Sequence, residues 1–389
     1  MFLLAANPCS KKSYMILSTG MKKIAGMHGG DYLGEGTYGC TLDPHPACRG
    51  NVQFLNSKVQ KQQPIATVGK VFVEQKHADE EWNVALMLYK IDPMQSHFIY
   101  PTSRCDTTVA SVKKAQEKRH CTNMMRTSKK QVKMIMLQNG GIALQEYMMR
   151  NMMQPVDLLQ SLLPVFHGLV KLSKNGIVHH DMKFDNILYN PVTMQCRAID
   201  FGLMVATKDA LTFGGNPYIF SNYWLHPPEY RVLVSMHKHN WKHMDTAEMR
   251  QMLSSHLSIY KIRFSPLDSL HISDLILNGK IFSYCDYERS YMLFMKQLYK
   301  HKNKEGIIGY MQRFANRIDV YSLGITLLYL TMYMNTTLTT NNVEQQLQSL
   351  IRSMIHPDPR KRSTPTKCLR DVLKIVGTSS AQKAFPVIA

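Results

Sequence analysis

The chain has 389 residues, and its hydrophobic fraction of 44% supplies enough apolar side chains for one two-lobed unit or two domains. Its 47 Lys and Arg residues against 28 Asp and Glu residues give a formal net charge of +19, which favours acidic partners: nucleotides, nucleic acids, anionic membranes or acidic proteins. A membrane-spanning helix is not expected, because the long apolar run from Leu323 to Met334 is much shorter than the ~20 residues that a span requires.

The cysteines and the first residues concern the compartment in which the protein works. The eight cysteines are scattered along the chain and form neither a disulfide framework nor a C-x-x-C pair. We therefore expect reduced thiols in a cytosol-like compartment. The N-terminal run MFLLAANPCSKK has no basic region before its short apolar stretch, so we expect no secretion signal and a soluble protein.

A glycine-rich run lies near the start of the chain, with Gly34, Gly36 and Gly39 in a G-x-G-x-x-G pattern. Glycines at this spacing leave room for backbone amides to close over phosphate oxygens. A plain hairpin turn would have the same composition, so the order of the later motifs has to decide between the two.

Residues 43–64 are polar and rich in turn-forming residues, which predicts an enlarged connection between two strands. Cys40, His45 and Cys48 are candidate metal ligands. They are loosely spaced and lack a fourth partner, so a plain loop is the better interpretation.

A strand and a helix are expected next. Residues 66–73 alternate between apolar and small residues around one charged side chain, Lys70. Helix-forming residues follow over 79–88, with acids in the expected first turn. Glu81 is our choice for an ion pair with Lys70, because its position leaves apolar residues on the buried face, and Glu80 is the alternative.

A basic segment at 111–133 contains a single acidic residue, Glu117. A solvated excursion between two strands explains it, and the alternatives are a docking patch for an acidic substrate or a contact with a phosphate backbone. Interleaved aromatic residues are absent, which disfavours single-stranded nucleic acid. The basic residues are Lys113, Lys114, Lys118, Arg119, Arg126, Lys129, Lys130 and Lys133.

A predicted helix over 158–175 stops at Gly176 and leads into the polar cluster around which the chain is organised. This cluster is the stretch 178–189, followed by Asp200-Phe201-Gly202. Apolar runs flank both parts. The acidic and amide groups are therefore expected on short loops between buried strands, where electrostatic interactions are strong.

This combination suits phosphoryl transfer, which needs positioned charge more than covalent help. Asp181 fits the group that orients an attacking hydroxyl. Asp200 and Asn186 fit Mg²⁺ ligands, because this ion prefers a few hard oxygen atoms from the protein. Lys183 can place an ammonium group near the transferring phosphate.

These residues resemble the catalytic loop H-R-D-L-x-x-x-N and the magnesium motif D-F-G of eukaryotic-type protein kinases. The resemblance implies that the glycine-rich run covers the phosphates of ATP and that Lys70 grips the α- and β-phosphates. The predicted buried strand 132–137 would lead into the hinge, with Met136 as gatekeeper and the backbone of Leu137 and Asn139 facing adenine. A second hinge-like run, 144–147, leaves the register open.

The later motifs fit the same resemblance. Residues 200–229 resemble an activation segment that ends in A-P-E, and Glu229 is expected to form a buried bidentate pair with Arg362. Residues 319–324 resemble the start of the central buried helix, whose Asp319 would hold the backbone of the catalytic loop. The helically patterned stretch 231–312 then forms a large insertion, either a partner-docking element or a packed extension.

The chain departs from the family pattern at two places. His180 replaces the Arg that binds a phosphorylated activation segment in many kinases, so we expect activity that does not depend on such a phosphate. Asn222 lies about where Ser/Thr kinases keep a Thr that bonds the catalytic Asp and Lys; Ser221 is a substitute in a shifted register. Lys183 favours serine or threonine over tyrosine as the acceptor.

The expected fold is therefore α+β and protein-kinase-like, with a small β-rich N-lobe and a larger helical C-lobe that carries an insertion before its central helix. The predicted parts are an extension at 1–27, an N-lobe at 28–143 with loop insertions at 43–64 and 105–131, a C-lobe at 144–375 with the insertion 231–312, and a tail at 376–389.

The expected activity is Mg²⁺-dependent transfer of the ATP γ-phosphate to serine or threonine of proteins. Residues 36–40, 140–141 and 223–229 are most similar to the divergent kinases of large cytoplasmic DNA viruses. That implies the host-cell cytoplasm or the virion as location and acidic or virion proteins as substrates. A pseudokinase scaffold and a small-molecule kinase are the alternatives. A scaffold has no chemical need for all four of Lys70, Asp181, Asn186 and Asp200, and a small-molecule kinase has no need for the pair of Glu229 and Arg362.

Overall fold

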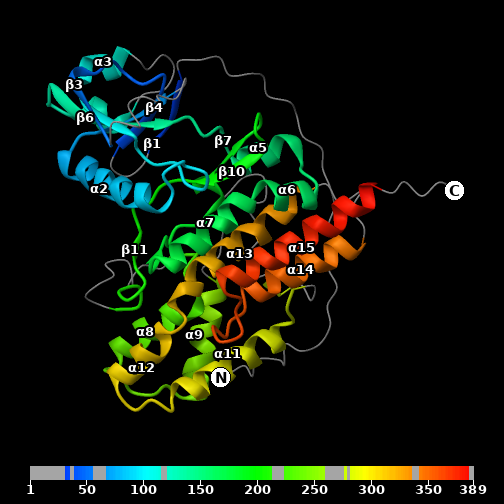
Figure 1. Cartoon of the computed structure of the whole chain (residues 1–389). Helices are drawn as coiled ribbons and strands as arrows, with labels where there is room; N and C mark the ends of the chain where they lie inside the picture. The colour runs from blue at the N-terminus through cyan, green and yellow to red at the C-terminus, as the bar shows by residue number, and fades with distance from the viewer. Residues whose placement is uncertain are drawn as a thin grey trace, which may run out of the picture. The chain divides into compact units, whose positions relative to one another are not determined.

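The computed structural model describes residues 31–35, 39–55, 67–114, 121–212, 223–258, 276–277, 281–334 and 341–384 (Figure 1). The chain separates into two compact units, one formed by Lys12–Gly141 and one formed mainly by Ile142–Ala389. The fold is mixed α+β, with a β-sheet in the N-terminal half and helices in the C-terminal half. Among the described residues, no helix has both the length and the apolar character that crossing a membrane would need.

The N-terminal unit is built on one antiparallel sheet. Its strand order is β1-β2-β4-β6-β5-β3, so the strand that carries Lys70 pairs with β2 on one side and β6 on the other. Buried side chains from β2, β4, β5 and β6 form its core, because alternate residues of these strands point to the same face. The strands are β1 (Asp31–Glu35), β2 (Gly39–Asp43), β3 (Arg49–Phe54), β4 (Thr67–Phe72), β5 (Ser103–Thr108) and β6 (Gln131–Gln138).

Helix α2 (Gln75–Ile91) contacts β4 and β6 of this sheet. Its buried residues, Ala78, Trp82, Ala85 and Leu88, recur every three or four positions and therefore share one face. The helix predicted over 79–88 is confirmed, but it begins four residues earlier. The expected acidic first turn was wrong for this reason, since no acid lies in the first turn of α2.

Two segments expected as loops contain regular structure. Within 43–64, strand β3 pairs with β5 at the edge of the sheet; its side chains are mostly exposed, so it lacks the apolar alternation that signals a strand. Within 105–131, the first residues belong to β5, and the helices α3 (Val109–Lys114) and α4 (Thr122–Arg126) follow. Residues 56–66 and 115–120 lie outside the described part of the chain.

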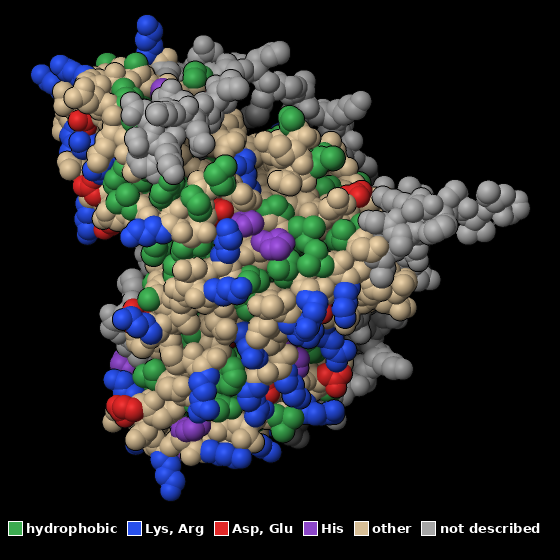
Figure 2. Space-filling model, viewed as in Figure 1, with side chains coloured by type: hydrophobic (Ala, Val, Ile, Leu, Met, Phe, Trp, Pro, Cys, Tyr) green, Lys and Arg blue, Asp and Glu red, His purple; other side chains and the backbone are tan. Residues whose placement is uncertain are grey.

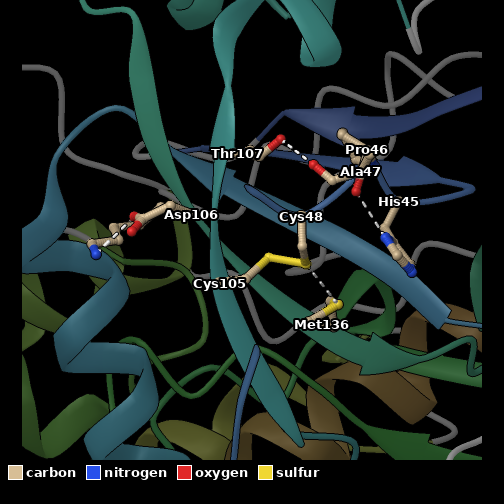
Figure 3. The surroundings of a disulfide bond; sticks show 9 residues. His45, Pro46, Ala47, Cys48, Cys105, Asp106, Thr107 and Met136 are labelled. Atoms are coloured by element: carbon tan, nitrogen blue, oxygen red, sulfur yellow. Dashed lines mark hydrogen bonds and ion pairs between the residues drawn. A yellow bond between two sulfur atoms is a disulfide. The ribbon is translucent and has the colours of Figure 1, made fainter. Parts of the chain in front are cut away.

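Two disulfide bonds in this unit contradict the expectation of reduced thiols. Cys40 is bonded to Cys121, and Cys48 is bonded to Cys105, across sequence separations of 81 and 57 residues. Figure 3 shows the second bond between the connection after β2 and strand β5, where the Thr107 hydroxyl also donates to the Ala47 carbonyl at 2.8 Å. Spacing along the chain could not show these pairs, because the sheet brings the cysteines together.

The C-terminal unit is mainly helical (Figure 1). The helix predicted over 158–175 is present as two helices that meet at Leu162, because Pro164 lacks the N–H that would continue the hydrogen-bond ladder. The helical pattern predicted near Tyr291 is confirmed by α11. The helices are α5 (Leu144–Asn151), α6 (Pro155–Ser161), α7 (Leu163–Lys174), α8 (Pro228–Lys238), α9 (Thr246–Ser258), α11 (Tyr284–Leu298), α12 (Lys304–Gln312), α13 (Ile318–Leu330), α14 (Asn341–Met354) and α15 (Pro365–Ala384).

Helix α13 is the core of this unit, and all of its residues are buried. It packs closely on α14 at Gly324, where an added Cβ would lie 2.6 Å from Ile355 Cγ2 and 2.7 Å from Met354 Cβ. The sequence prediction of a central buried helix at this position is confirmed.

Short strands place the polar cluster next to α13. β9 (Ile187–Asn190) lies between β10 (Gln195–Ala198) and β7 (Ile142–Ala143), and β8 (Ile177–Val178) pairs with β11 (Val205–Ala206). The loop 179–186 therefore starts from one small sheet and ends in the other, with the short 3-10 helix η1 (Phe184–Asn186) at its end.

Candidate active site

Helix α13 anchors the loop 179–186 through hydrogen bonds. The buried carboxylate of Asp319 accepts hydrogen bonds from the backbone N–H groups of His179 at 2.7 Å and His180 at 2.8 Å. Burial raises the pKa of Asp319, and these two donors partly oppose that shift. Farther along the same helix, the Thr326 hydroxyl donates to the Met182 carbonyl at 2.8 Å. The predicted role of Asp319 as the anchor of this loop is confirmed.

Asp181, Lys183 and Asn186 converge at the centre of the loop. Asp181 is almost fully buried, and its Oδ2 accepts a hydrogen bond from Asn186 Nδ2 at 2.7 Å and lies 3.1 Å from Lys183 Nζ. Asn186 Nδ2 also lies 3.0 Å from the Asp181 carbonyl oxygen. A buried carboxylate that is held by an ammonium and an amide has a fixed orientation.

The second carboxylate oxygen of Asp181 has a partner that sequence reasoning missed. The Tyr223 hydroxyl donates a hydrogen bond to Asp181 Oδ1. Burial and the negative charge of Asp181 raise the pKa of Tyr223, so this phenol remains protonated. Residues Ser221 and Asn222, which were considered for this contact, lie outside the described part of the chain. The sequence did not indicate that Tyr223 contacts Asp181, because this contact depends on the path of the backbone between the two residues.

Asp200 lies on the loop that follows β10. Its side chain is exposed and accepts a long hydrogen bond from Gly202 N at 3.4 Å, whereas Phe201 is buried against the ring of His179. The Ile199 N–H donates to the Asn186 carbonyl at 2.9 Å, which ties this loop to the loop of Asp181. Both predicted magnesium ligands thus belong to hydrogen-bonded neighbouring segments.

The donor atoms fit a magnesium ion in their chemistry. Asn186 uses its Nδ2 for Asp181, which turns its carbonyl Oδ1 the other way, and Asp200 presents an exposed carboxylate. These are hard oxygen donors of the kind that Mg²⁺ prefers. Within the described ranges, no group of three or more His, Cys, Asp or Glu side chains is arranged to hold a metal ion, and the predicted pair is smaller than such a group.

Two residues of these loops have left-handed backbone conformations without being glycine. His180 has a φ of 68° and Asp200 has a φ of 60°. Each such conformation costs about 1–3 kcal/mol and persists only where the surroundings hold it, which happens most often at functional sites.

His180 is buried in a hydrogen-bonded network of its own. Its Nδ1 lies 3.2 Å from the Leu203 carbonyl oxygen, and its Nε2 contacts the Tyr230 hydroxyl, whose oxygen also lies 3.0 Å from the Ala210 carbonyl oxygen. Burial lowers the pKa of His180 to about 4. The imidazole is therefore neutral at physiological pH and would not supply the positive charge that an arginine at this position would give to a phosphate.

Lys70 and Glu81 form the predicted ion pair in the N-terminal unit. Lys70 Nζ lies 2.6 Å from Glu81 Oε2, and both side chains are about one-fifth exposed. Glu80, the alternative, contacts Lys76 and His77 on the outer surface of α2. The choice of Glu81 is confirmed, because helix α2 turns this residue, and not its neighbour, toward strand β4.

The glycine-rich run is described only in part. Gly34 pairs with Thr41 in the β1–β2 ladder, and Gly36 lies outside the described residues. Gly39 has a structural reason to be glycine, because a Cβ there would lie 2.2 Å from the Val71 carbonyl oxygen. This close approach of β2 to β4 explains one glycine of the motif without any phosphate; the predicted phosphate contact remains a prediction.

The end of β6 carries the predicted hinge. Leu137 pairs with Val68 in the sheet, and the Asn139 side chain donates to Asp43 Oδ2 at 2.8 Å and accepts from Gly141 N at 2.9 Å. The alternative hinge at 144–147 was wrong, because these residues form the first turn of helix α5. The contacts of Leu137 and Asn139 with adenine remain a prediction.

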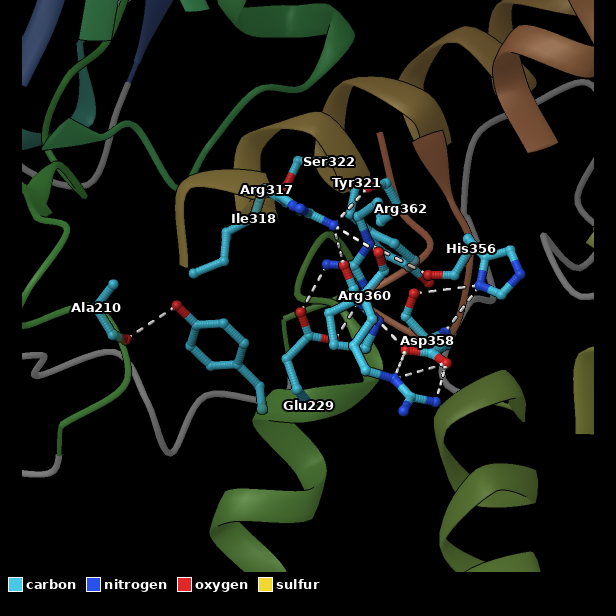
Figure 4. Close-up of polar contacts among 12 residues, drawn as sticks. Ala210, Glu229, Arg317, Ile318, Tyr321, Ser322, His356, Asp358, Arg360 and Arg362 are labelled. Carbon is cyan, nitrogen blue, oxygen red and sulfur yellow. Dashed lines mark hydrogen bonds and ion pairs between the residues drawn. The ribbon is translucent and has the colours of Figure 1, made fainter. Parts of the chain in front are cut away.

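The predicted pair of Glu229 and Arg362 is confirmed and fully buried (Figure 4). Arg362 donates two parallel hydrogen bonds to the two carboxylate oxygens, at 2.6 and 2.9 Å. Its guanidinium also lies over the Tyr321 ring at 4.9 Å. Such fork-like geometry is what makes a buried charge pair tolerable, and it fastens the start of α8 to the loop before α15.

Positive charge is spread over the surface. On the face in Figure 2, Lys and Arg side chains gather over the helices of the C-terminal unit. In the basic segment, Lys113 and Lys114 are exposed, whereas Lys133 pairs with Asp106 at 2.7 Å and Lys129 donates to the Val73 carbonyl. Part of this segment is therefore used within the fold, and only part of it is solvated as predicted.

Comparison with protein-family models and with curated proteins finds no match for the chain.

Proposed function

We propose that this protein is a serine/threonine protein kinase with a bilobal kinase-like fold, which transfers the γ-phosphate of ATP to hydroxyl groups of protein substrates. The observation that carries the proposal is the arrangement of Asp181, Lys183 and Asn186 above Asp319. One buried carboxylate, oriented by an ammonium and an amide on a loop anchored to a buried helix, is suited to receive a proton from an acceptor hydroxyl.

The chemistry follows from these atoms. The acceptor hydroxyl gives its proton to Asp181 as its oxygen attacks the γ-phosphorus, the bond to the bridging oxygen breaks, and ADP leaves with the electron pair. Lys183 Nζ lies next to Asp181 Oδ2, where it is placed to offset negative charge that develops on the transferring group. The strained backbones of His180 and Asp200 support a functional role for both loops.

Asn186 and Asp200 would hold the magnesium ion through oxygen atoms. Magnesium, when bound, would neutralise charge on the phosphates. Lys70, oriented by Glu81, would bind the α- and β-phosphates, and the glycine-rich run Gly34–Gly39 would cover them.

The same proposal includes protein substrates, with acidic or virion proteins first among them. It also includes a relationship to the kinases of large cytoplasmic DNA viruses. The buried Glu229 and Arg362 pair supports a protein rather than a small-molecule acceptor, since the corresponding pair belongs to the protein-kinase resemblance. Host-cell cytoplasm or virion is the location that this relationship implies.

The proposal is tested with radiolabelled ATP, Mg²⁺ and a panel of acidic, basic and virion-like proteins. We expect phosphoserine or phosphothreonine from the unmodified protein, and a loss of kcat of at least ~10² in Asp181→Asn and Asp200→Asn, because each removes a charge used in transfer. Asp245→Asn is the matched control: the same chemical change at an exposed helix-capping residue, where Asn caps equally well.

The alternatives give different results in the same assay. ATP binding without transfer to any acceptor would indicate a pseudokinase scaffold, and label found only in a metabolite would indicate a small-molecule kinase. Transfer that persists in Asp181→Asn would contradict the assigned role of that residue.

A further inference from the structure

The two oxygens of the Asp181 carboxylate have different partners. Oδ2 is held by Asn186 Nδ2 at 2.7 Å and by Lys183 Nζ at 3.1 Å. Oδ1 is taken by the hydroxyl of Tyr223, which belongs to a different part of the chain. The carboxylate therefore receives donors on both sides, although the proposed reaction needs one side for the acceptor hydroxyl.

Tyr223 adds little to the orientation of Asp181. Asn186 already bonds both the side chain and the backbone carbonyl of Asp181, and the Asp319 carboxylate fixes the backbone just before it. Since the carboxylate is already held in position, the contact with Tyr223 has another consequence. It fills the oxygen that remains, with a hydroxyl donor of the same chemical kind as the acceptor.

The Tyr223 side chain and its backbone are held by different contacts. The Tyr223 carbonyl accepts a hydrogen bond from His226 N at 3.1 Å, which fixes a turn at the start of the segment that leads into α8. The ring meets Trp224 and His226 edge-on, with centroids 6.2 and 5.4 Å apart. This turn is a backbone contact, so displacing the phenol from Asp181 does not require that it break.

We propose that Tyr223 occupies the acceptor-hydroxyl position of Asp181 and competes with the substrate, so that a serine or threonine hydroxyl reaches the carboxylate only by displacing the phenol. The inference rests on the proposed kinase function and adds a specificity-determining residue to it. Only acceptors whose other contacts make up for the lost hydrogen bond would be phosphorylated efficiently. Free hydroxyl compounds and water would be disfavoured by the same competition.

The test is the Tyr223→Phe variant, which keeps the ring and removes the competing hydroxyl. A competitor raises the apparent KM of the acceptor, because the intrinsic KM is divided by the fraction of molecules in which the site is open. A hydrogen bond to a charged group is strong enough for the acceptor KM to fall roughly tenfold in Tyr223→Phe, with the gain in KM rather than in kcat. The KM of ATP is expected to stay within about twofold, because ATP does not use this oxygen.

Tyr284→Phe is the matched control, because it removes a hydroxyl from a half-buried tyrosine at the start of α11 and is expected to behave as wild type. Thermal melting of both variants checks that the fold is intact. A lower kcat at unchanged acceptor KM in Tyr223→Phe would overturn the inference and make Tyr223 a positioning residue for Asp181. An unchanged acceptor KM and kcat would overturn it as well.

A failure of the inference differs from a failure of the proposed function. If wild type and Tyr284→Phe transfer phosphate to protein, the function stands and the acceptor KM of Tyr223→Phe decides the inference. If neither transfers phosphate although both bind ATP, the kinase function is refuted and the inference with it.

Discussion

At the scale of single residues, burial decides how the ionisable groups around the candidate site behave. His180 shows this most directly, because it stands where the kinase resemblance has a permanently charged arginine, and burial lowers its pKa to about 4. His179 lowers the pKa further through its proximity, whereas the Leu203 carbonyl and Asp181 raise it. A neutral imidazole that bridges Leu203 and Tyr230 joins the two segments without any phosphate.

The depressed pKa of His180 predicts a loss of stability in acid. The unfolded histidine titrates near pH 6.5, so between about pH 6.5 and pH 4 the unfolded chain binds more protons than the folded one. The contribution of His180 is therefore complete above pH 6.5 and falls by about 2 kcal/mol at pH 5. We expect His180→Gln to reduce the difference in the free energy of unfolding between pH 7.5 and pH 5 by this amount, measured by urea denaturation.

His239→Gln, at an exposed position, is the control for this prediction. His256, which is buried, and His356, which is half-buried, also have lowered pKa values, so some acid sensitivity is expected to remain in His180→Gln. An identical pH dependence in His180→Gln and wild type would contradict the prediction.

At the scale of elements, covalent and ionic contacts join segments that are distant in the sequence. In the N-terminal unit, Cys40 of β2 is bonded to Cys121 at the start of α4, and Cys48 is bonded to Cys105 of β5. These bonds fasten β2 to the basic segment 111–133, in which Cys121 lies, and fasten the connection after β2 to strand β5. In the C-terminal unit, Arg362 fastens the loop before α15 to α8.

Removing the first disulfide is expected to destabilise the N-terminal unit. Because the bond closes a long loop, the double variant Cys40→Ser, Cys121→Ser should lose about 2–4 kcal/mol of unfolding free energy under oxidising conditions. Urea denaturation measures the loss, and peptide mapping without reductant shows the bond in wild type. In excess dithiothreitol the difference between variant and wild type should vanish.

Cys368→Ala controls for the loss of a cysteine that is buried but not bonded. Equal stability of the double variant and oxidised wild type would mean that Cys40 and Cys121 are not joined in solution. If peptide mapping does find the bonds, the cysteines no longer support a cytosol-like compartment. The location itself remains a prediction.

Breaking the buried pair of Glu229 and Arg362 on one side should cost more than removing both partners. Arg362→Met leaves the Glu229 carboxylate buried without its counter-charge, so we expect a loss of about 3–5 kcal/mol of unfolding free energy. The double variant Glu229→Leu, Arg362→Met should recover much of this loss. Urea denaturation of the two single variants, the double variant and wild type completes the cycle.

The pair of Arg250, which is exposed, and Glu288, whose side chain is about one-fifth exposed, is the control, and Arg250→Met is expected to cost less than about 1 kcal/mol. Strictly additive effects of the two single substitutions at 229 and 362 would show that the pair is not coupled.

At the scale of the whole molecule, the polar groups are positioned by the elements that pack against them. Asp319 on α13 holds the loop of Asp181, and the buried face of α2 turns Glu81 toward Lys70. The local motifs of this chain are therefore held in position by the elements that pack against them. A change in α13 is expected to alter the position of Asp181.

The sequence by itself determined the residues whose spacing is local: the pairing of Lys70 with Glu81 and the cluster of Asp181, Lys183 and Asn186. Local spacing suffices there because strand and helix periods fix which side chains share a face. The buried helix that begins near Asp319 was predicted through the kinase resemblance. The pair of Glu229 and Arg362 was predictable only through the resemblance, since no local period links them.

Only the tertiary structure decided the contacts that depend on how distant segments meet. It paired Cys40 with Cys121 and Cys48 with Cys105, placed β3 at an exposed edge of the sheet, and brought the Tyr223 hydroxyl to Asp181. These contacts leave no periodic trace in the sequence, because each depends on the path of the backbone between the partners rather than on the residues next to them.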